Sequence, residues 1–439
     1  MLEFEAVVLA CGVGEKLLPL SANGGLDFML PVGLKPLISY PLQSLQQAGA
    51  AKVVVVVSGD HAAATLKSWM ASGEAPMQFQ TVNVPEGSGS ADALRAAISH
   101  LTLDLVVVMG YNLVMDVPLR ATLLSHYVNS ATASVMFTRR KTSASSQTKP
   151  GKVPENVDYV ALDEEKHRLL FYAGNPTKIK ELQIPGSVLS SNPSLCLTTN
   201  FQDTQLYIFS RAVLTLVEVN RRWSNIQQDL IPYLMKQQFR RPLTESLNVE
   251  GRTVTEESDP VGSTDGGGTM LGLDMMRMGG FNVASFMVGQ KEYCSRITSM
   301  QEFADVNKEL ASPELCRNLV GLPPSRNDDY VHDSVVQGNK STIATACIVW
   351  EGTVLGDKTN VKRAVIGSRC RLGNGVKVIN SVVLDDVIIG DNAHIQNSVV
   401  GPGCTIGAKV QLKECQVGPD FTIAEGSQIK GEVLPEPAD

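Results

Sequence analysis

The C-terminal part of the chain repeats its hydrophobic positions with a period of seventeen residues. Three aliphatic columns recur there, separated by six, six and five positions. The columns are Val349, Ile366, Val383, Val400 and Val417; Leu355, Leu372, Ile389, Ile406 and Ile423; and Val361, Val378, Ile395, Leu412 and Ile429. A strict period of this kind indicates one structural unit that is stacked on copies of itself.

Each repeat has three sides that are too short for helices, and its β-branched anchors suit strands. Glycine follows the second column at Gly356, Gly373, Gly390 and Gly407, where we expect it to let the chain turn a tight corner. The pattern therefore predicts a parallel β-helix over residues 331–432, with the three columns pointing inward.

The first 245 residues show a different pattern, in which short apolar runs alternate with helical periodicity. The runs and the helical segments are Phe4–Ala10, Val53–Val57 and Leu105–Met109, and Leu37–Ala48, His61–Trp69 and Ser90–His100. This alternation predicts a Rossmann-like α/β domain, in which helices cover both faces of a parallel sheet. We expect a linker and connecting segment at 246–330. Within these parts, Thr142–Pro154 and Glu250–Gly280 have loop composition.

Charge and cysteine content exclude several classes of protein. The net charge of −7 argues against a nucleic-acid-binding protein. Cys370 and Cys404 share a column two coils apart, about 9–10 Å at strand spacing, which is too far for a disulfide. We expect all eight cysteines to be reduced, with no metal site, since no zinc-ligand spacing exists. Neither a signal peptide nor a membrane-length apolar run is present, so we expect a cytosolic protein.

Three N-terminal motifs resemble those of the sugar-1-phosphate nucleotidyltransferases. Leu9–Leu20 resembles the glycine-rich signature A-G-G-x-G-T-R-L-x-P-L-T. Leu26–Pro36 resembles the following P-K-P-L-x-P-V-x-x-K-P segment, and Gly89–Leu94 resembles G-T-A-x-A-L. The resemblance implies a nucleotidyltransferase-like sheet domain followed, as in several family members, by a left-handed β-helix.

The chain departs from the enzymes at charged positions. Their reaction displaces pyrophosphate from a nucleoside triphosphate and needs cations and a carboxylate-bound magnesium ion. Glu15 replaces threonine, Asp27 replaces the first lysine, and Asn112 stands where the metal-binding aspartate is expected. We therefore expect no catalytic residue, no metal ion and no cofactor. What remains is a remnant nucleotide pocket, formed by Ala10, Gly12, Gly14, Lys16, Gly89 and Asn112.

This combination is similar to the gamma and epsilon subunits of eukaryotic translation initiation factor 2B. Gln228–Leu234 and Cys294–Ile297 also fit the gamma type. The chain ends at Asp439, shortly after the last repeat, without the helical exchange domain expected of epsilon. The resemblance implies a non-catalytic subunit that pairs with an epsilon-like subunit and the other subunits of that factor. It also implies action on the G protein initiation factor 2, whose GDP is exchanged for GTP. From the net charge and the lack of a membrane-length apolar run, we expect no direct contact to nucleic acid or membrane.

Three other interpretations stay open. The first is an active sugar-1-phosphate nucleotidyltransferase, and the second is a subunit that binds a nucleotide without turning it over. The third is an acyltransferase, because such β-helix enzymes use a catalytic histidine. His394 stands beside an inward anchor, so we expect it at the surface. We expect Trp350 to cover the N-terminal end of the β-helix or to pack on a partner.

Overall fold

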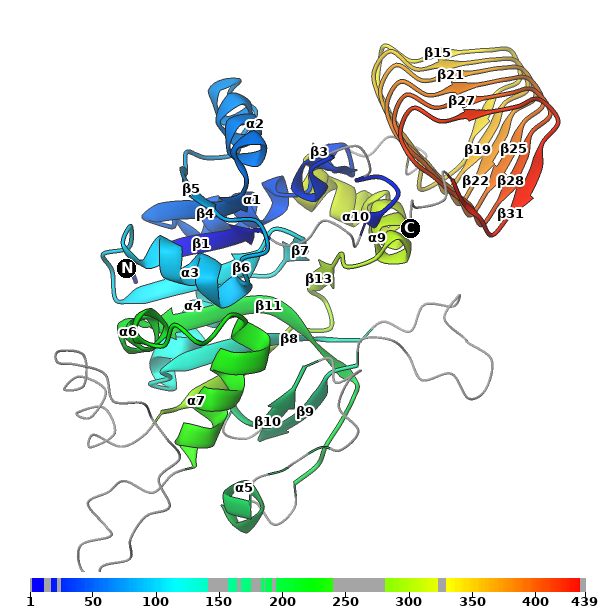
Figure 1. Cartoon of the computed structure of the whole chain (residues 1–439). Coiled ribbons are helices and arrows are strands. Elements are labelled where there is room, and N and C mark those ends of the chain that lie inside the picture. Colours follow the sequence, from blue (N-terminus) through cyan, green and yellow to red (C-terminus); the bar gives the residue numbers. More distant parts are fainter. Residues whose placement is uncertain are drawn as a thin grey trace, which may run out of the picture. The chain divides into compact units, whose positions relative to one another are not determined.

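The structure, a computed structural model, divides into two compact units, each built from separate stretches of the chain (Figure 1). It describes residues 2–11, 17–21, 25–140, 157–163, 167–174, 182, 184, 186–191, 195–239, 281–322 and 329–434. Unit 1 comprises Met1–Gly12, Ser44–Gly110 and Val117–Glu292. Unit 2 comprises Val13–Gln43, Tyr111–Asp116 and Tyr293–Asp439.

The structure does not test the two segments of predicted loop composition. Thr142–Pro154 and Glu250–Gly280 lie outside the described residues. The domain boundaries expected at 245, 330 and 432 stay a prediction. In the described part of the chain, no helix combines the length and the apolar character needed to cross a membrane.

Unit 1 contains a mixed sheet of nine strands in the order β5-β4-β1-β6-β11-β8-β12-β10-β9. The strands are β1 (Glu5–Ala10), β4 (Lys52–Ser58), β5 (Gln80–Val84), β6 (Leu105–Gly110), β8 (Ala133–Arg139), β9 (Tyr159–Asp163), β10 (Arg168–Ala173), β11 (Phe201–Ser210) and β12 (Val283–Met287). Strands β5, β4, β1 and β6 are mutually parallel, whereas β11 is antiparallel to both of its neighbours. The three strands predicted from apolar runs are confirmed.

Helices bury the sheet in the way that its continuous apolar runs require. Those of this part of the chain are α1 (Ser39–Ala48), α2 (Asp60–Ala71), α3 (Ser90–Ile98), α4 (Leu119–Val128), α5 (Gly186–Ser191), α6 (Arg211–Val219), the π-helix η5 (Ile226–Leu230) and α7 (Ile231–Gln238). Helices α3, α6 and α7 lie along the sheet (Figure 1). Their apolar side chains form a single core with one face of the sheet. Each valine of Val53–Val57 is at most 1% exposed, so β4 is covered on both faces.

Unit 2 begins with short elements that are far apart in the sequence. They are the 3-10 helix η3 (Asp27–Met29), β2 (Pro31–Val32), β3 (Lys35–Pro36), β7 (Leu113–Asp116), β13 (Tyr293–Arg296), α9 (Met300–Leu310), α10 (Pro313–Leu315) and the π-helix η7 (Cys316–Val320). Strand β13 pairs antiparallel with β7. The Gly33 N–H donates 2.9 Å to the side-chain oxygen of Asn307 in α9, which ties the β2–β3 turn to that helix.

The C-terminal part of unit 2 is a parallel β-helix with three sheets (Figure 1). The first sheet contains β14 (Tyr330–Val331), β17 (Ile348–Val349), β20 (Val365–Ile366), β23 (Val382–Val383), β26 (Val399–Val400), β29 (Gln416–Val417) and β32 (Val433–Leu434). The second contains β15 (Val336–Gln337), β18 (Val354–Leu355), β21 (Arg371–Leu372), β24 (Ile388–Ile389), β27 (Thr405–Ile406) and β30 (Thr422–Ile423). The third contains β16 (Thr342–Ile343), β19 (Asn360–Lys362), β22 (Lys377–Ile379), β25 (His394–Gln396), β28 (Gln411–Lys413) and β31 (Gln428–Lys430).

The inward columns of the repeat are confirmed. The residues of all three columns line the interior, and only Ile429, in the last coil, is partly buried rather than buried. Cysteines fill further inward positions, and all eight cysteines of the chain are free thiols, as predicted. The stacking begins one coil before the seventeen-residue grid, at Tyr330.

The explanation expected for the column of glycines is wrong in its physical reason. Gly356 and Gly373 do not adopt a positive φ, and the left-handed corner residues follow two positions later, at Lys358 and Gly375. A Cβ on Gly356 would lie 2.6 Å from the backbone carbon of Gly373 in the next coil. Glycine is therefore required here by the close approach of stacked backbones, and not by the turn.

One side of the β-helix is covered by the chain itself. The outward residues of the first sheet are at most 4% exposed at Ile348, Val365, Val382 and Val399. They join a hydrophobic cluster with α9, η7 and the β2–β3 region. Trp350 packs against Tyr330 and His332 of the preceding coil, with ring centroids 5.5 Å and 5.3 Å away.

Candidate functional site

The first predicted site residues lie at the carboxyl end of β1 in unit 1. Ala10 is buried and Cys11 is half-buried. Burial raises the pKa of Cys11 to about 11, and the negative charge of Asp92 adds to this shift. Cys11 is therefore a neutral thiol at physiological pH. Gly12, Gly14 and Lys16, and with them Glu15, lie outside the described residues.

Gly89 stands at the N-terminus of α3, where backbone N–H groups could bind an anion. Two of these donors are already paired within unit 1. The Gly89 N–H donates to the Asp92 carboxylate at 3.3 Å, and the Ala91 N–H donates to the Ser224 carbonyl at 2.9 Å. A Cβ on Gly89 would overlap the Ser224 carbonyl oxygen. This packing alone is enough to require glycine at position 89.

Arg95 holds the same helix end in place, and the sequence patterns did not single it out. Its guanidinium donates to Asp92 at 2.6 Å. It also donates to three backbone carbonyls, those of Val217, Asn220 and Trp223, at 2.8–2.9 Å. All three lie in or after α6, more than 120 positions further along the chain. The guanidinium of Arg95 thus binds the backbone at the end of α6 and in the segment that follows it, and its donors do not face a ligand.

Asn112 lies in unit 2, just before β7, and is 7% exposed. Its side-chain N–H donates 2.9 Å to the Ile297 carbonyl, and the Ile297 N–H donates 2.9 Å to the Asn112 carbonyl. An aspartate could not donate the first of these bonds, because an ionised carboxylate only accepts. The amide at position 112 therefore has a structural use that the enzyme-type carboxylate would not serve.

The segment that resembles the lysine-rich motif is also engaged in packing. Asp27 is buried, and the Tyr111 hydroxyl donates to its carboxylate at 3.4 Å. The Lys35 ammonium donates 3.2 Å to the Leu319 carbonyl near the end of η7, and burial lowers the pKa of Lys35. A cation is favourable at a helix C-terminus. Lys35 thus stabilises the cluster that covers the β-helix.

A second buried polar cluster in unit 1 was not expected from the sequence. Asp203 is 0% exposed and lies in β11, where the pairing with β8 is irregular. Its carboxylate accepts bonds from Tyr207 at 2.7 Å, Gln227 at 2.7 Å and Tyr172 at 2.9 Å. Burial and the Asp203 charge raise the pKa of Tyr172 well above its ordinary value. These bonds satisfy the carboxylate and hold the irregular strand, so the cluster has no free nucleophile.

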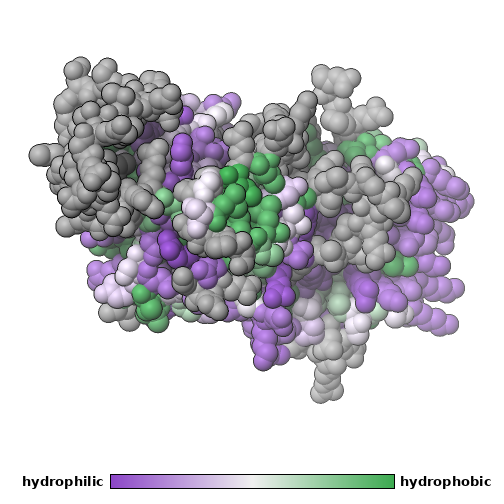
Figure 2. Space-filling view, turned by 90° about the horizontal axis from the view of Figure 1, so that it is seen from below, coloured by the Kyte–Doolittle hydropathy of each residue, from purple (hydrophilic) through white to green (hydrophobic). Residues whose placement is uncertain are grey.

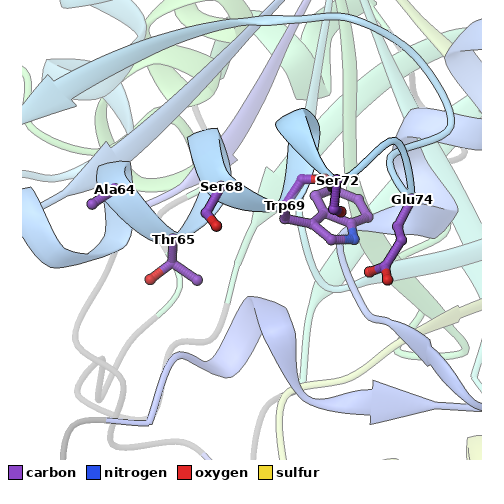
Figure 3. Close-up of a pocket in the computed structure, with 6 residues that line it drawn as sticks. All are labelled: Ala64, Thr65, Ser68, Trp69, Ser72 and Glu74. Atoms are coloured by element: carbon purple, nitrogen blue, oxygen red, sulfur yellow. Dashed lines mark hydrogen bonds between the residues drawn. The ribbon is translucent and has the colours of Figure 1, made fainter.

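A surface hollow of about 550 Å³ lies on α2, apart from all of these residues. It is lined by Ala64, Thr65, Ser68, Trp69, Ser72 and Glu74 (Figure 3). Two of its hydroxyls are engaged with the helix backbone, since Thr65 donates to the His61 carbonyl and Ser72 to the Trp69 carbonyl. The Trp69 indole is 6% exposed and packs near Phe79. The hollow contains none of the predicted site residues.

Only part of the predicted pocket lies within the described residues. Within the described ranges, no group of three histidine, cysteine or acidic side chains could hold a metal ion. Of the predicted pocket, Ala10 and Gly89 lie in unit 1 and Asn112 in unit 2. The predicted pocket as a whole stays a prediction.

Two family models match the chain. One, described as nucleotidyl transferase, matches residues 5–148. The other, described as the eIF2B subunit epsilon LbH domain, a left-handed β-helix, matches residues 326–429. These matches and the observed sheets confirm the predicted fold class, a nucleotidyltransferase-like mixed-sheet domain followed by a left-handed parallel β-helix.

Curated relatives extend the similarity over both parts. The eIF2B subunit gamma of Schizosaccharomyces pombe is 28% identical over 366 residues, which cover 82% of this chain and 74% of the relative. The subunit gamma of Dictyostelium discoideum is 24% identical and covers 84% and 88%. That of Caenorhabditis elegans is 24% identical and covers 54% and 59%. These relatives and the two family models support the predicted resemblance of the chain to the translation initiation factor eIF2B gamma subunits.

Proposed function

We propose that the chain is a non-catalytic subunit of the cytosolic exchange factor that replaces GDP with GTP on initiation factor 2. In this role it pairs with an epsilon-like subunit, assembles with the other eIF2B subunits, and contributes surface rather than chemistry. The observation that carries the proposal is the reciprocal bonding of Asn112 with Ile297. The position expected to hold a catalytic metal ligand instead joins two segments of unit 2.

Electrostatics supports the absence of nucleotidyl transfer. Charge builds on phosphoryl oxygens in that reaction and requires preorganised cations. Two unit charges about 4 Å apart interact by roughly 4 kcal/mol at an effective dielectric of about 20. Loss of one metal carboxylate and one cation would thus slow the reaction by about five or six powers of ten. Arg95 and Lys35 do not replace them, since both are bound to backbone carbonyls.

Ala10, Gly12, Gly14, Lys16, Gly89 and Asn112 are accordingly proposed as a remnant of a nucleotide pocket. Equilibrium titration with GTP and with ATP tests whether this remnant still binds a nucleotide. Gly14 replaced by a bulky residue is the control. An affinity that is weakened by this replacement would identify a nucleotide-binding subunit.

The function is tested by measuring release of labelled GDP from initiation factor 2. We expect no acceleration by the chain alone, and a faster release by an epsilon subunit when this chain is co-purified with it. A chain that remains a monomer in the presence of epsilon and accelerates exchange by itself would contradict the proposal.

The competing activity is tested separately by pyrophosphate release from a nucleoside triphosphate and a sugar 1-phosphate. Ordinary enzymes turn over at about 1 per second or faster. Turnover in that range would establish an active nucleotidyltransferase and overturn the non-catalytic assignment.

A further inference from the structure

The outer face of the third β-helix sheet carries lysines and amides and no carboxylate. Each of β19, β22, β25, β28 and β31 turns its middle residue inward and its other two residues outward. Register places the outward residues in two columns: Asn360, Lys377, His394, Gln411 and Gln428, and Lys362, Ile379, Gln396, Lys413 and Lys430. We refer to these two columns as the lysine face.

The charge of this face is opposite to that of the whole chain, whose net charge is −7. Its four lysines, Lys362, Lys377, Lys413 and Lys430, are all exposed. Within the described part of the chain, none of the four takes part in an ion pair. The positive charges are therefore available to another molecule.

The face is also broad and rigid. Strands in a sheet lie about 4.8 Å apart, so Lys362 and Lys430, four coils apart, are separated by roughly 19 Å. The backbone is hydrogen-bonded from coil to coil, for example from the Lys377 N–H to the Ala393 carbonyl at 2.9 Å. A preformed surface loses little conformational entropy on binding.

The other two sheets differ from it. The first is covered by α9 and its neighbours. The second presents a single outward column, which includes the exposed Val336, Val354 and Ile388. The surface at the β-helix end of Figure 2 is mainly hydrophilic.

We propose that the lysine face is a docking surface for another protein that presents a flat acidic patch. Symmetric pairing with the lysine face of a second copy does not fit, because it would place like charges opposite one another. A nucleic acid is also disfavoured, because the chain as a whole has a net charge of −7. Glutamine and asparagine on the face can both donate to and accept from such a partner.

The test is a titration of the purified full-length chain with a fluorescein-labelled peptide of twenty glutamates at low ionic strength. Lys362→Glu combined with Lys413→Glu reverses two charges on the face. Lys358→Glu combined with Lys409→Glu is the matched control, since these exposed lysines occupy the adjacent corner of the same two coils. We expect the control to bind like the wild type and the face variant to bind at least about tenfold more weakly.

Equal affinity of the three proteins for the peptide would overturn the proposal. So would tighter binding of a labelled uridine 20-mer that is lost in the face variant, because that result would assign the face to nucleic acid. If the face variant unfolds at a lower temperature than the control, Lys362→Gln with Lys413→Gln replaces it. The titration uses the chain alone, so its outcome is independent of the exchange assay.

Discussion

The side-chain N–H of Asn112 and the carbonyl of Ile297 form a 2.9 Å hydrogen bond between residues 185 positions apart. The backbone N–H of Ile297 returns a bond to the Asn112 carbonyl. This pair lies at the start of the β7–β13 ladder, so it sets the position where the connection to α9 begins. The position where the resemblance predicts a metal ligand is here hydrogen-bonded to a distant segment of unit 2.

Asn112→Asp is expected to destabilise the chain by about 1–3 kcal/mol without creating magnesium binding. The change removes the donor and places a buried carboxylate against a carbonyl oxygen. Chemical denaturation with and without magnesium measures both effects. Asn397→Asp is the control, because Asn397 uses its side-chain oxygen as an acceptor from Asn380, and aspartate retains that oxygen. A rise in stability of Asn112→Asp with magnesium would show that the metal site can be restored.

Gly89→Ala is expected to cost about 3 kcal/mol or more, since the added methyl group would overlap the Ser224 carbonyl and overpacking of backbone is poorly relieved. Thermal unfolding measures the loss. Gly186→Ala is the matched control at the start of α5, where an added Cβ meets no atom within 4 Å. If the two variants have the same stability, the close packing of α3 on the Ser224 loop is incorrect.

The stability of the chain is expected to depend on His126 below neutral pH. Burial lowers the pKa of His126 from 6.5 to about 4, and its ring nitrogen lies 2.8 Å from the Ser134 hydroxyl. Between these two pH values the unfolded chain binds a proton at His126 and the folded chain does not. Stability therefore falls as pH is lowered from 6.5 to 4, by up to about 3 kcal/mol.

Urea denaturation at pH 7 and at pH 4 checks this dependence. His126→Asn keeps a donor but does not titrate, so its loss of stability on acidification is expected to be smaller than that of the wild type. Ser134→Ala is the control, because it removes the hydroxyl and leaves the titrating group in place. Identical pH profiles of wild type and His126→Asn would contradict the assignment.

The cysteines of the β-helix interior are expected to resist alkylation in the folded chain. Burial raises the pKa of Cys370 to about 12, and its thiol donates 3.1 Å to the Leu384 carbonyl. Cys196 is exposed. With iodoacetamide at pH 8, we expect rapid labelling of Cys196, and labelling of Cys370 only in denaturant, because the thiolate is the reactive form. Peptide mass mapping measures both sites, and comparable labelling of Cys370 in the native chain would rule out its burial.

The sequence by itself determined the features that local pattern controls. The columns represented by Val383, Ile389 and Ile395 point inward. Each short side of the repeating coil has one aliphatic anchor, and burying these anchors requires that they face the interior. The strand Val53–Val57 is buried because five consecutive valines require cover on both faces.

Tertiary structure alone decided the features that depend on distant segments. Glycine is required at position 356 because the backbone of Gly373 lies too close for a Cβ. The period predicts that these two residues are neighbours, but it does not give the distance between their backbones. Arg95 donates to backbone carbonyls more than 120 positions away. Every residue has a backbone carbonyl, so the amino-acid sequence does not indicate which of them Arg95 binds. Val382 and Ile379 are both outward and apolar, yet only Val382 is buried, because α9 and η7 cover the first sheet and not the third. Periodicity determines which side chains point outward from the β-helix. The packing of other segments determines which of these outward side chains are exposed to solvent.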